Sequence, residues 1–378
     1  MPISETPKVK FLEGDSTTNK IGTGAQIPIF ICATKNTTPL PGIGKFSKYS
    51  ETQAATNLTE NPGLISKTDD AQDTSAFVLG VLEDFFEESL KVNSNDIGVP
   101  YIYFKDMGTT ALTGNAAWTT AMQEIKAKRD VQVEAYLFQS TDTTANIKAI
   151  LTSALARVKE DNKKGNPRVI YYTIEGADKA KLKELTNATT GIQDSRIAPI
   201  MPEKMGKILA KICCTPHYEE PGYTEFRTIP AGTLTQRTDE EELELQNAGI
   251  IFARDEITNS SIHPKINLAV SSAFAADENS RANDCLLHHR RNTDQLIREA
   301  VDIVYPQLKR NETQVNITQV QADLDVLVRE KIRAGHMKTG TFMDVIESEE
   351  NPFKLIITGK SLPVNSSDLI EMTVYVGE

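Results

Sequence analysis

Residues 131–174 read VQVEAYLFQSTDTTANIKAILTSALARVKEDNKKGNPRVIYYTI, and this stretch decides the fold. Its first eight residues and residues 168–174 are rich in β-branched and aromatic side chains, which favour strands. Gly165 and Pro167 separate the second strand from the segment before it. In that segment apolar residues recur at helical spacing, namely at Ile147, Ile150, Leu151, Ala154, Leu155 and Val158. A strand, a helix and a second strand of this kind predict two parallel strands joined by a crossover helix.

The same alternation extends in both directions from this unit. Apolar strands are expected at 27–33, 99–105, 196–200 and 249–254, and helices at 75–90, around 118–125, near 179–185 and at 203–213. The acidic run at 239–242 is typical of a helix start, where carboxylates interact favourably with the helix dipole, although it also suits a docking patch. Repeated βα units predict an α/β body with a largely parallel sheet covered by helices.

The C-terminal part has a different pattern, with two helices followed by three strands. Thr293 is expected to cap the first helix, and Thr318 with Gln321 has capping-box spacing for the second, which Gly335 ends. Strands are expected at 341–347, 353–359 and 369–376. The expected domains are an N-terminal arm at 1–25, an α/β body at 26–255 with a compact outer part around 35–95, an α+β domain at 256–360, and a C-terminal arm at 361–378.

Composition excludes several functional classes. The 378 residues carry a formal net charge of −11, which disfavours direct binding of nucleic acid or of anionic lipid, since both need a basic surface. The sequence has no apolar run of about 18 residues and no secretory leader pattern, so no membrane span is expected. There are 4 cysteines without C-x-x-C spacing, so we expect buried reduced thiols and no metal site.

Motifs for catalysis or cofactor binding are weak. Gly22-Thr23-Gly24 is a partial dinucleotide fingerprint, but it lacks the third glycine and precedes a strand. No phosphate-binding loop and no G-x-S-x-G elbow occur, and His217 and His263 lie in proline-flanked loops without a serine motif. A Ser–His–Asp triad assembled in space stays possible, but no sequence feature points to one. We therefore expect no cofactor.

A strand that alternates in polarity, carried on a polar tether, stands near each end of the chain. The first is at 8–12, with Val9 and Phe11, and the last has Ile370, Met372, Val374 and Val376 on one face. A lone strand leaves its backbone hydrogen-bonding groups unpaired, so each must join a sheet. Folding back onto its own domain and adding to the sheet of a neighbouring subunit are both open, and periodicity alone favours the former.

Several strings, in their order along the chain, resemble the contractile tail sheath proteins of myoviruses and of phage-like injection particles. They include IGTGAQIPIFICATKN at 21–36, LEDFFEESLKVNSNDIGVPYIYFKD at 82–106, ICCTPHYEEPGYTEFRTIPAG at 212–232, NAGIIFARDE at 247–256, HHRRNTDQLIREAVDIVYPQLKRNET at 288–313 and KLIITGKSLPVNSSDLIEMTVYVGE at 354–378. Glu312-Thr313 departs from the aromatic residue common at that point in the family, and large outer domains are lacking. The resemblance implies a subtilisin-like fold for the body and a structural role without enzymatic activity.

The resemblance also implies partners and sites. Such subunits assemble helically around an inner tube and contract to drive it through a cell envelope. Expected partners are further copies of the chain, the inner tail tube protein, and baseplate and tail terminator proteins, within a virion tail assembled in the host cytoplasm. The implied intersubunit strand residues are Val9, Phe11, Ile370, Met372, Val374 and Val376, and the implied tube-facing residues are Arg290, Arg291, Lys331 and Arg333. An α/β enzyme or nucleotide-binding domain of unknown substrate is the alternative.

Overall fold

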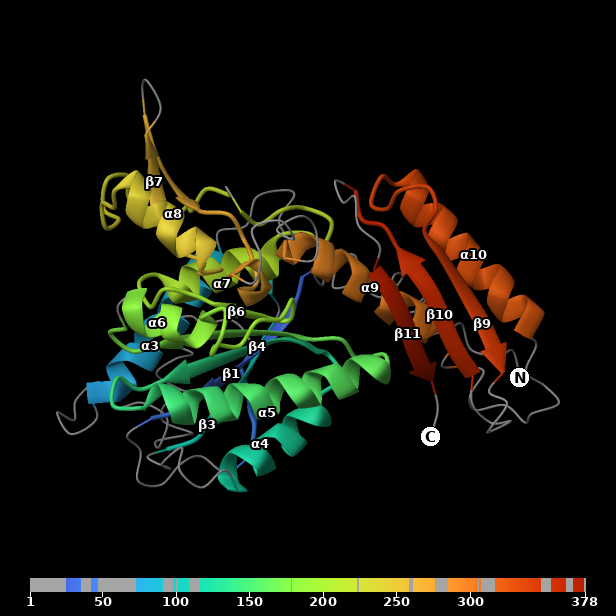
Figure 1. Cartoon of the computed structure of the whole chain (residues 1–378), viewed down its shortest axis with the longest axis horizontal. Helices are drawn as coiled ribbons and strands as arrows, with labels where there is room; N and C mark the ends of the chain where they lie inside the picture. Colours follow the sequence, from blue (N-terminus) through green and yellow to red (C-terminus); the bar gives the residue numbers. More distant parts are fainter. Residues whose placement is uncertain are drawn as a thin grey trace.

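A computed structural model of the chain forms an α/β body beside a smaller C-terminal unit (Figure 1). It describes residues 25–34, 42–46, 73–90, 98–99, 101–108, 116–177, 179–222, 224–257, 261–275, 285–304, 306, 317–347, 355–364 and 370–376. The N-terminal arm expected at 1–25 and most of the expected outer part at 35–95 therefore lie outside the described residues. The helix of that outer part which is described packs into the body itself.

The body is built on a six-stranded sheet with the order β2-β3-β1-β4-β5-β6. Five strands are parallel and the edge strand β2 is antiparallel. Their bounds are β1 Ile27–Cys32, β2 Gly44–Phe46, β3 Ile102–Asp106, β4 Val131–Phe138, β5 Val169–Ile174 and β6 Ile197–Pro199. Strands β1 and β5 are buried along their whole length, which explains why they read as nearly continuous apolar runs, and β3 is equally buried although it ends in Lys105 and Asp106. The predicted parallel sheet is confirmed.

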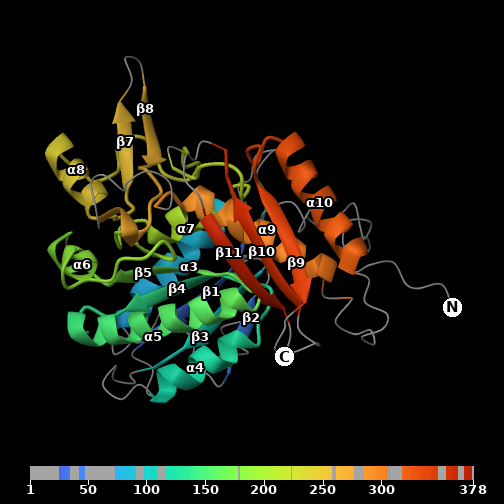
Figure 2. The same cartoon turned by 45° about the vertical axis from the view of Figure 1, so that its right-hand side comes forward.

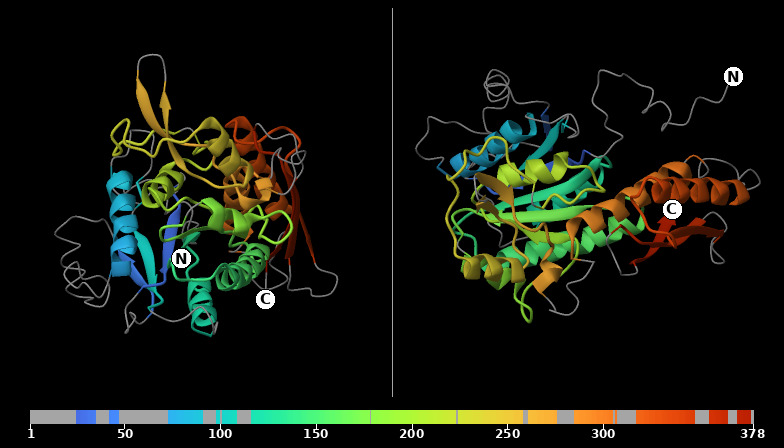
Figure 3. Two further views of the ribbon diagram at one scale, coloured as in Figure 1. Left: turned by 60° about the vertical axis from the view of Figure 1, so that its left-hand side comes forward. Right: turned by 90° about the horizontal axis from the view of Figure 1, so that it is seen from above.

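Helices cover both faces of this sheet, with α4 and α5 on one side and α3 and α7 on the other (Figure 3). The body helices are α3 Asp73–Leu90, α4 Ala116–Lys126, α5 Thr144–Lys163, α6 Lys179–Thr186, α7 Met205–Cys214 and α8 Asp239–Asn247. Thr143 caps α5 by accepting from the backbone N–H of Asn146. Thr238 and Glu241 form a complete capping box at α8, so the acidic run does begin a helix.

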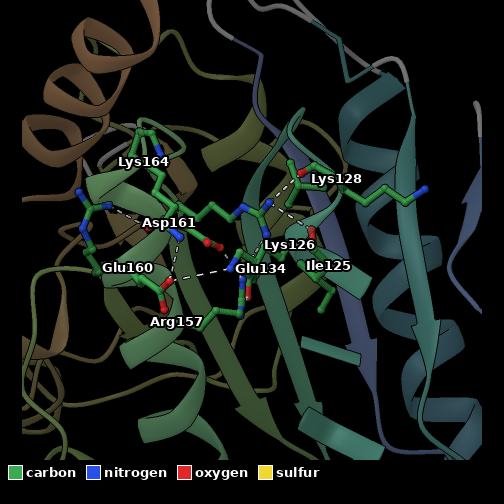
Figure 4. A network of polar contacts seen from close by, with 12 residues as sticks. Ile125, Lys126, Lys128, Glu134, Arg157, Glu160, Asp161 and Lys164 are labelled. Atoms are coloured by element: carbon green, nitrogen blue, oxygen red, sulfur yellow. Dashed lines mark hydrogen bonds and ion pairs between the residues drawn. The ribbon is translucent and has the colours of Figure 1, made fainter. Parts of the chain in front are cut away.

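Beneath the sheet lies a buried network of charged side chains centred on Glu134 of β4 (Figure 4). Its carboxylate is fully buried and accepts from Arg157 of α5 and, at 3.1 Å, from Arg168, which precedes β5. Arg168 also donates to the carbonyl oxygens of Ile125 and Lys128 at 3.1 and 2.7 Å. Burial alone raises the pKa of Glu134, but the two arginines outweigh it and hold that pKa below its ordinary value.

The C-terminal unit consists of two helices and a three-stranded antiparallel sheet with the order β11-β10-β9. Its elements are α9 Leu287–Val304, α10 Ile317–Arg333, β9 Phe342–Glu347, β10 Leu355–Ser361 and β11 Ile370–Val376. The apolar faces of α9, α10, β9 and β10 enclose a second hydrophobic core, separate from that of the body. The predicted order of two helices and three strands is confirmed.

The two cores meet within α9, not at the boundary expected between residues 255 and 256. The first core continues to Leu287, and the second begins at Leu296. The expected boundary instead falls inside the hairpin of β7 Ala253–Ile257 and β8 Ile262–Ile266, which is rooted in the first core.

Helix α9 also starts six residues before its expected cap. Thr293 is buried inside α9, where its hydroxyl hydrogen-bonds to Ser361 at 3.0 Å.

Candidate assembly site at the C-terminal sheet

Strand β10 is the centre of the C-terminal sheet, and β9 and β11 are its edges. Strand β11 pairs with β10 in antiparallel register, from Leu355 opposite Val376 to Ser361 opposite Ile370. It therefore joins the sheet of its own chain, which is one of the two alternatives that the sequence leaves open. An edge strand presents one row of backbone donors and acceptors to its surroundings, so this sheet is a place where another chain can add.

Strand β9, the other edge, has one face buried and one exposed. Met343 and Val345 point into the second core, whereas Phe342 and Ile346 are exposed. The side-chain amide of Gln321, on α10, bonds to the backbone of β9. It donates to the carbonyl oxygen of Met343 at 2.8 Å and accepts from the N–H of Val345 at 2.9 Å. Gln321 thus satisfies two backbone groups of β9 in the way that a neighbouring strand would.

Helix α9 ties this sheet to the body through three charged side chains. Asp294 forms a two-pronged ion pair with Arg196, which precedes β6, at 2.8 and 3.0 Å. Arg291 donates to Gln26 Oε1 at 3.1 Å and to the carbonyl oxygen of Thr215. Arg298 donates to backbone carbonyls of the body, including that of Val131 at 3.1 Å. The same helix contributes Ile297, Ala300 and Val304 to the second core, so it belongs to both units.

Four of the chain's 5 histidines gather where the loop after α7 meets the C-terminal unit. His217 is buried, and neither of its ring nitrogens has a hydrogen-bond partner among the described residues. Its ring meets that of His336, in the turn after α10, edge to face at 5.6 Å, and Tyr218 stacks on His336 at 4.1 Å. Burial, and then the nearby charges of Lys331 and Arg291, lower the pKa of His217 to about 2.

The residues expected to face the inner tube do not form one exposed basic patch. Arg291 is buried, so its expected exposure is wrong: its guanidinium is enclosed between Gln26 and Thr215. Arg290 lies 3.4 Å from Asp294, and Lys331 pairs with Glu299 at 2.8 Å, which leaves only Arg333 of the four on the exposed surface. The sequence did not reveal the burial of Arg291 because its partners, Gln26 and Thr215, are far away in the chain, whereas Asp294 lies one helical turn from Arg290.

Of the residues expected in the strand arms, Val9 and Phe11 lie outside the described residues. Ile370, Met372, Val374 and Val376 fall in β11, as the alternating pattern predicts. Their role between subunits stays a prediction.

A chain of polar contacts resembling a catalytic triad does occur, at Ser261, His263 and Glu225. The hydroxyl of Ser261 hydrogen-bonds with His263 Nε2, and His263 Nδ1 lies 3.1 Å from Glu225 Oε1. These contacts lie on the exposed face of the β7–β8 hairpin, whereas acyl-transfer catalysis depends on preorganised oxyanion donors in a site that excludes water. The hairpin position therefore favours a bracing role for these three side chains.

Among the residues that the structure describes, no group of three or more His, Cys, Asp or Glu side chains is placed to hold a metal ion. No helix in that part of the chain is long and apolar enough to cross a membrane. All four cysteines are buried, as expected, and burial raises the pKa of the Cys32 and Cys213 thiols.

Comparison with known proteins rests on structure alone. No protein-family model matches the sequence, and no curated protein matches it. The contracted helical sheath of the anti-feeding prophage aligns over 94% of this chain and 91% of its own, with 12% identity and a TM-score of 0.58. A chain of the anti-feeding prophage baseplate aligns over 98% of both, with 14% identity and a TM-score of 0.61. The sheath tail protein of Listeria innocua covers 97% of this chain and 98% of its own, with 9% identity and a TM-score of 0.61. Along nearly its whole length, the chain has the fold of contractile sheath proteins.

Proposed function

We propose that this chain is a structural subunit of a contractile sheath. Copies would assemble helically around an inner tube and would contract to drive that tube through a cell envelope, without enzymatic activity. The observation that carries the proposal is β11, an edge strand of a small sheet at the end of a chain that has the sheath fold. The parallel strand order of the body also supports the finer expectation of a subtilisin-like fold.

The proposed partners are further copies of the chain, the inner tube protein, and baseplate and terminator proteins, within a particle tail assembled in the host cytoplasm. Strand β11 is linked to β10 by residues 362–369, a stretch that can span up to about 28 Å when extended. Exchange of β11 between copies would keep its backbone pairing with β10 while changing only the chain that supplies it. The N-terminal strand with Val9 and Phe11 would connect copies in the same way.

Electron microscopy of the purified chain tests the proposal directly. We expect hollow tubes or stacked rings at high protein concentration or after addition of preformed fragments. The α/β enzyme and the nucleotide-binding domain predict dispersed particles instead. A chain that remains strictly monomeric under both conditions would exclude the sheath role.

Truncation after Ser367 tests the strand itself. We expect a folded chain that no longer polymerises, because β11 is lost while all core residues described in the two hydrophobic cores remain. The matched control ends after Val376 and retains β11, so it should polymerise like the full chain. Circular dichroism and sedimentation velocity measure the two properties separately. Global unfolding of the shorter chain would instead indicate a strand that serves only its own fold.

A further inference from the structure

The β7–β8 hairpin projects from the body as a narrow arm (Figure 2). At its outer end Ile257 and Ile262 face each other across the two strands, and they are 70% and 39% exposed. Exposing two aliphatic side chains to water at the end of an arm is unfavourable in free energy. Clustered apolar side chains on a surface often mark an interaction site.

The arm is held stiffly on both sides. Arg254 of β7 pairs with Glu242 of α8 at 3.0 Å. On the side of β8, the backbone N–H of Phe226 donates to the carbonyl oxygen of Pro264 at 2.8 Å, and the contact between His263 and Glu225 adds a side-chain brace. The charges of the stem are thus largely satisfied within the chain, and the two strands that carry Ile257 and Ile262 are braced against the body. Such preorganisation lowers the entropy lost on binding.

A second group of exposed apolar side chains lies at the other end of the molecule. Phe342 and Ile346 stand on the outer face of β9 and are 46% and 50% exposed. Figure 1 shows α8 and β7 at one end of the longest axis, and β9 with α10 at the other. Two different apolar patches at opposite ends of one chain are what a head-to-tail contact between identical copies requires.

The segments beside the two patches, the start of α8 and the turn between α10 and β9, carry charges of opposite sign. Next to the hairpin, α8 begins with Asp239 and Glu240, and no cation of the described chain lies within ion-pair distance of either. Arg333 ends α10, and the turn from there to β9 contains Lys338 and no carboxylate, whereas Asp344 is exposed between Phe342 and Ile346 on the outer face of β9 itself. The acidic rim at the start of α8 and the basic rim at this turn favour the association of these two segments and fix its direction.

We propose that the tip of the β7–β8 hairpin of one copy docks on the outer face of β9 of a second copy, and that α8 meets the turn between α10 and β9. The contact rests on the proposed sheath function and adds a second connection to that made by the strand arms. It assigns Arg333 to a contact between subunits and not to the inner tube. Like other contacts between surface charges, the rim contacts weaken as salt screens them.

Replacing both tip residues in the full-length chain, Ile257→Ser with Ile262→Ser, tests the contact. Both side chains are exposed, so the melting temperature should stay close to that of the unaltered chain. The lowest concentration that gives tubes in sedimentation should rise roughly tenfold or more, since two aliphatic side chains no longer become buried. The matched control is Val326→Ser on α10, which removes an aliphatic side chain that is 45% exposed outside both patches. The control should polymerise normally.

Disulfide cross-linking tests the geometry. Chains with Ile257→Cys are mixed with chains carrying Ile346→Cys or Phe342→Cys, and mild oxidation follows; the native cysteines are buried. We expect dimers that contain one chain of each kind. Dimers joined only through Ile257→Cys on both chains, or tubes that form equally well without the apolar tip, would overturn the contact while leaving the sheath role intact. If the unaltered chain never polymerises, both proposals fail together.

Discussion

Glu134 has no exposed surface, and two arginines, Arg157 and Arg168, share its carboxylate. Replacement by glutamine, Glu134→Gln, would leave the Arg168 guanidinium buried without its carboxylate partner and Arg157 with Asp161 alone, at 3.1 Å. We expect the free energy of unfolding to fall by about 3–5 kcal/mol, as measured by urea titration. The control is Glu160→Gln on the same helix as Arg157, because Glu160 is exposed and pairs with two surface lysines, Lys126 and Lys164 (Figure 4). If the two variants were equally stable, the network would not hold the body together as described.

At the scale of elements, α7 and α3 approach each other at Gly206. A Cβ at that position would lie 2.0 Å from the carbonyl oxygen of Val81, so Gly206→Ala must push the helices apart. We expect a loss of about 1–3 kcal/mol in the free energy of unfolding. Gly80, inside α3, has open space around it, and Gly80→Ala should raise stability by about 0.5–1 kcal/mol. Two glycine-to-alanine changes in one helix pair should therefore shift the urea midpoint in opposite directions.

The sequence was most informative about the individual helices and strands. The unit of β4, α5 and β5 is predictable because a buried parallel strand is apolar throughout and a half-buried helix is apolar at every third or fourth residue. The start of α9 was not predictable, since its first turn is His288, His289, Arg290 and Arg291, and such residues usually lie at the surface. They are buried or nearly so because partners such as Glu220, distant in the chain, meet them in the fold.

At the scale of the whole molecule, the body and the C-terminal unit meet at His217, whose pKa is lowered to about 2. The folded chain keeps this imidazole neutral, while the unfolded chain binds a proton below about pH 6.5. Stability should therefore fall as pH drops below about 6.5, by about 2 kcal/mol between pH 7.5 and 5.0 for this one group. His217→Phe keeps the ring contact and should remove that share of the loss in urea titrations at both pH values. Val326→Ser on the exposed face of α10, which changes no titratable group, is the control and should leave the acid sensitivity unchanged. An unaltered acid sensitivity in His217→Phe would contradict this account.

The sequence also left open which chain supplies the partner of β11, because alternation determines the buried face of a strand but not the identity of its neighbour. In the single chain, β11 occupies one side of β10, and Gln321 satisfies two backbone groups of β9. Under the proposed exchange, a subunit must therefore give up an existing strand pairing before it accepts a new one, as in domain swapping. Growth from a free solution of subunits would then begin only after a lag. A preformed end would remove that lag, so at subunit concentrations too low for spontaneous growth the particle's own starting complex would decide where and when a sheath is built.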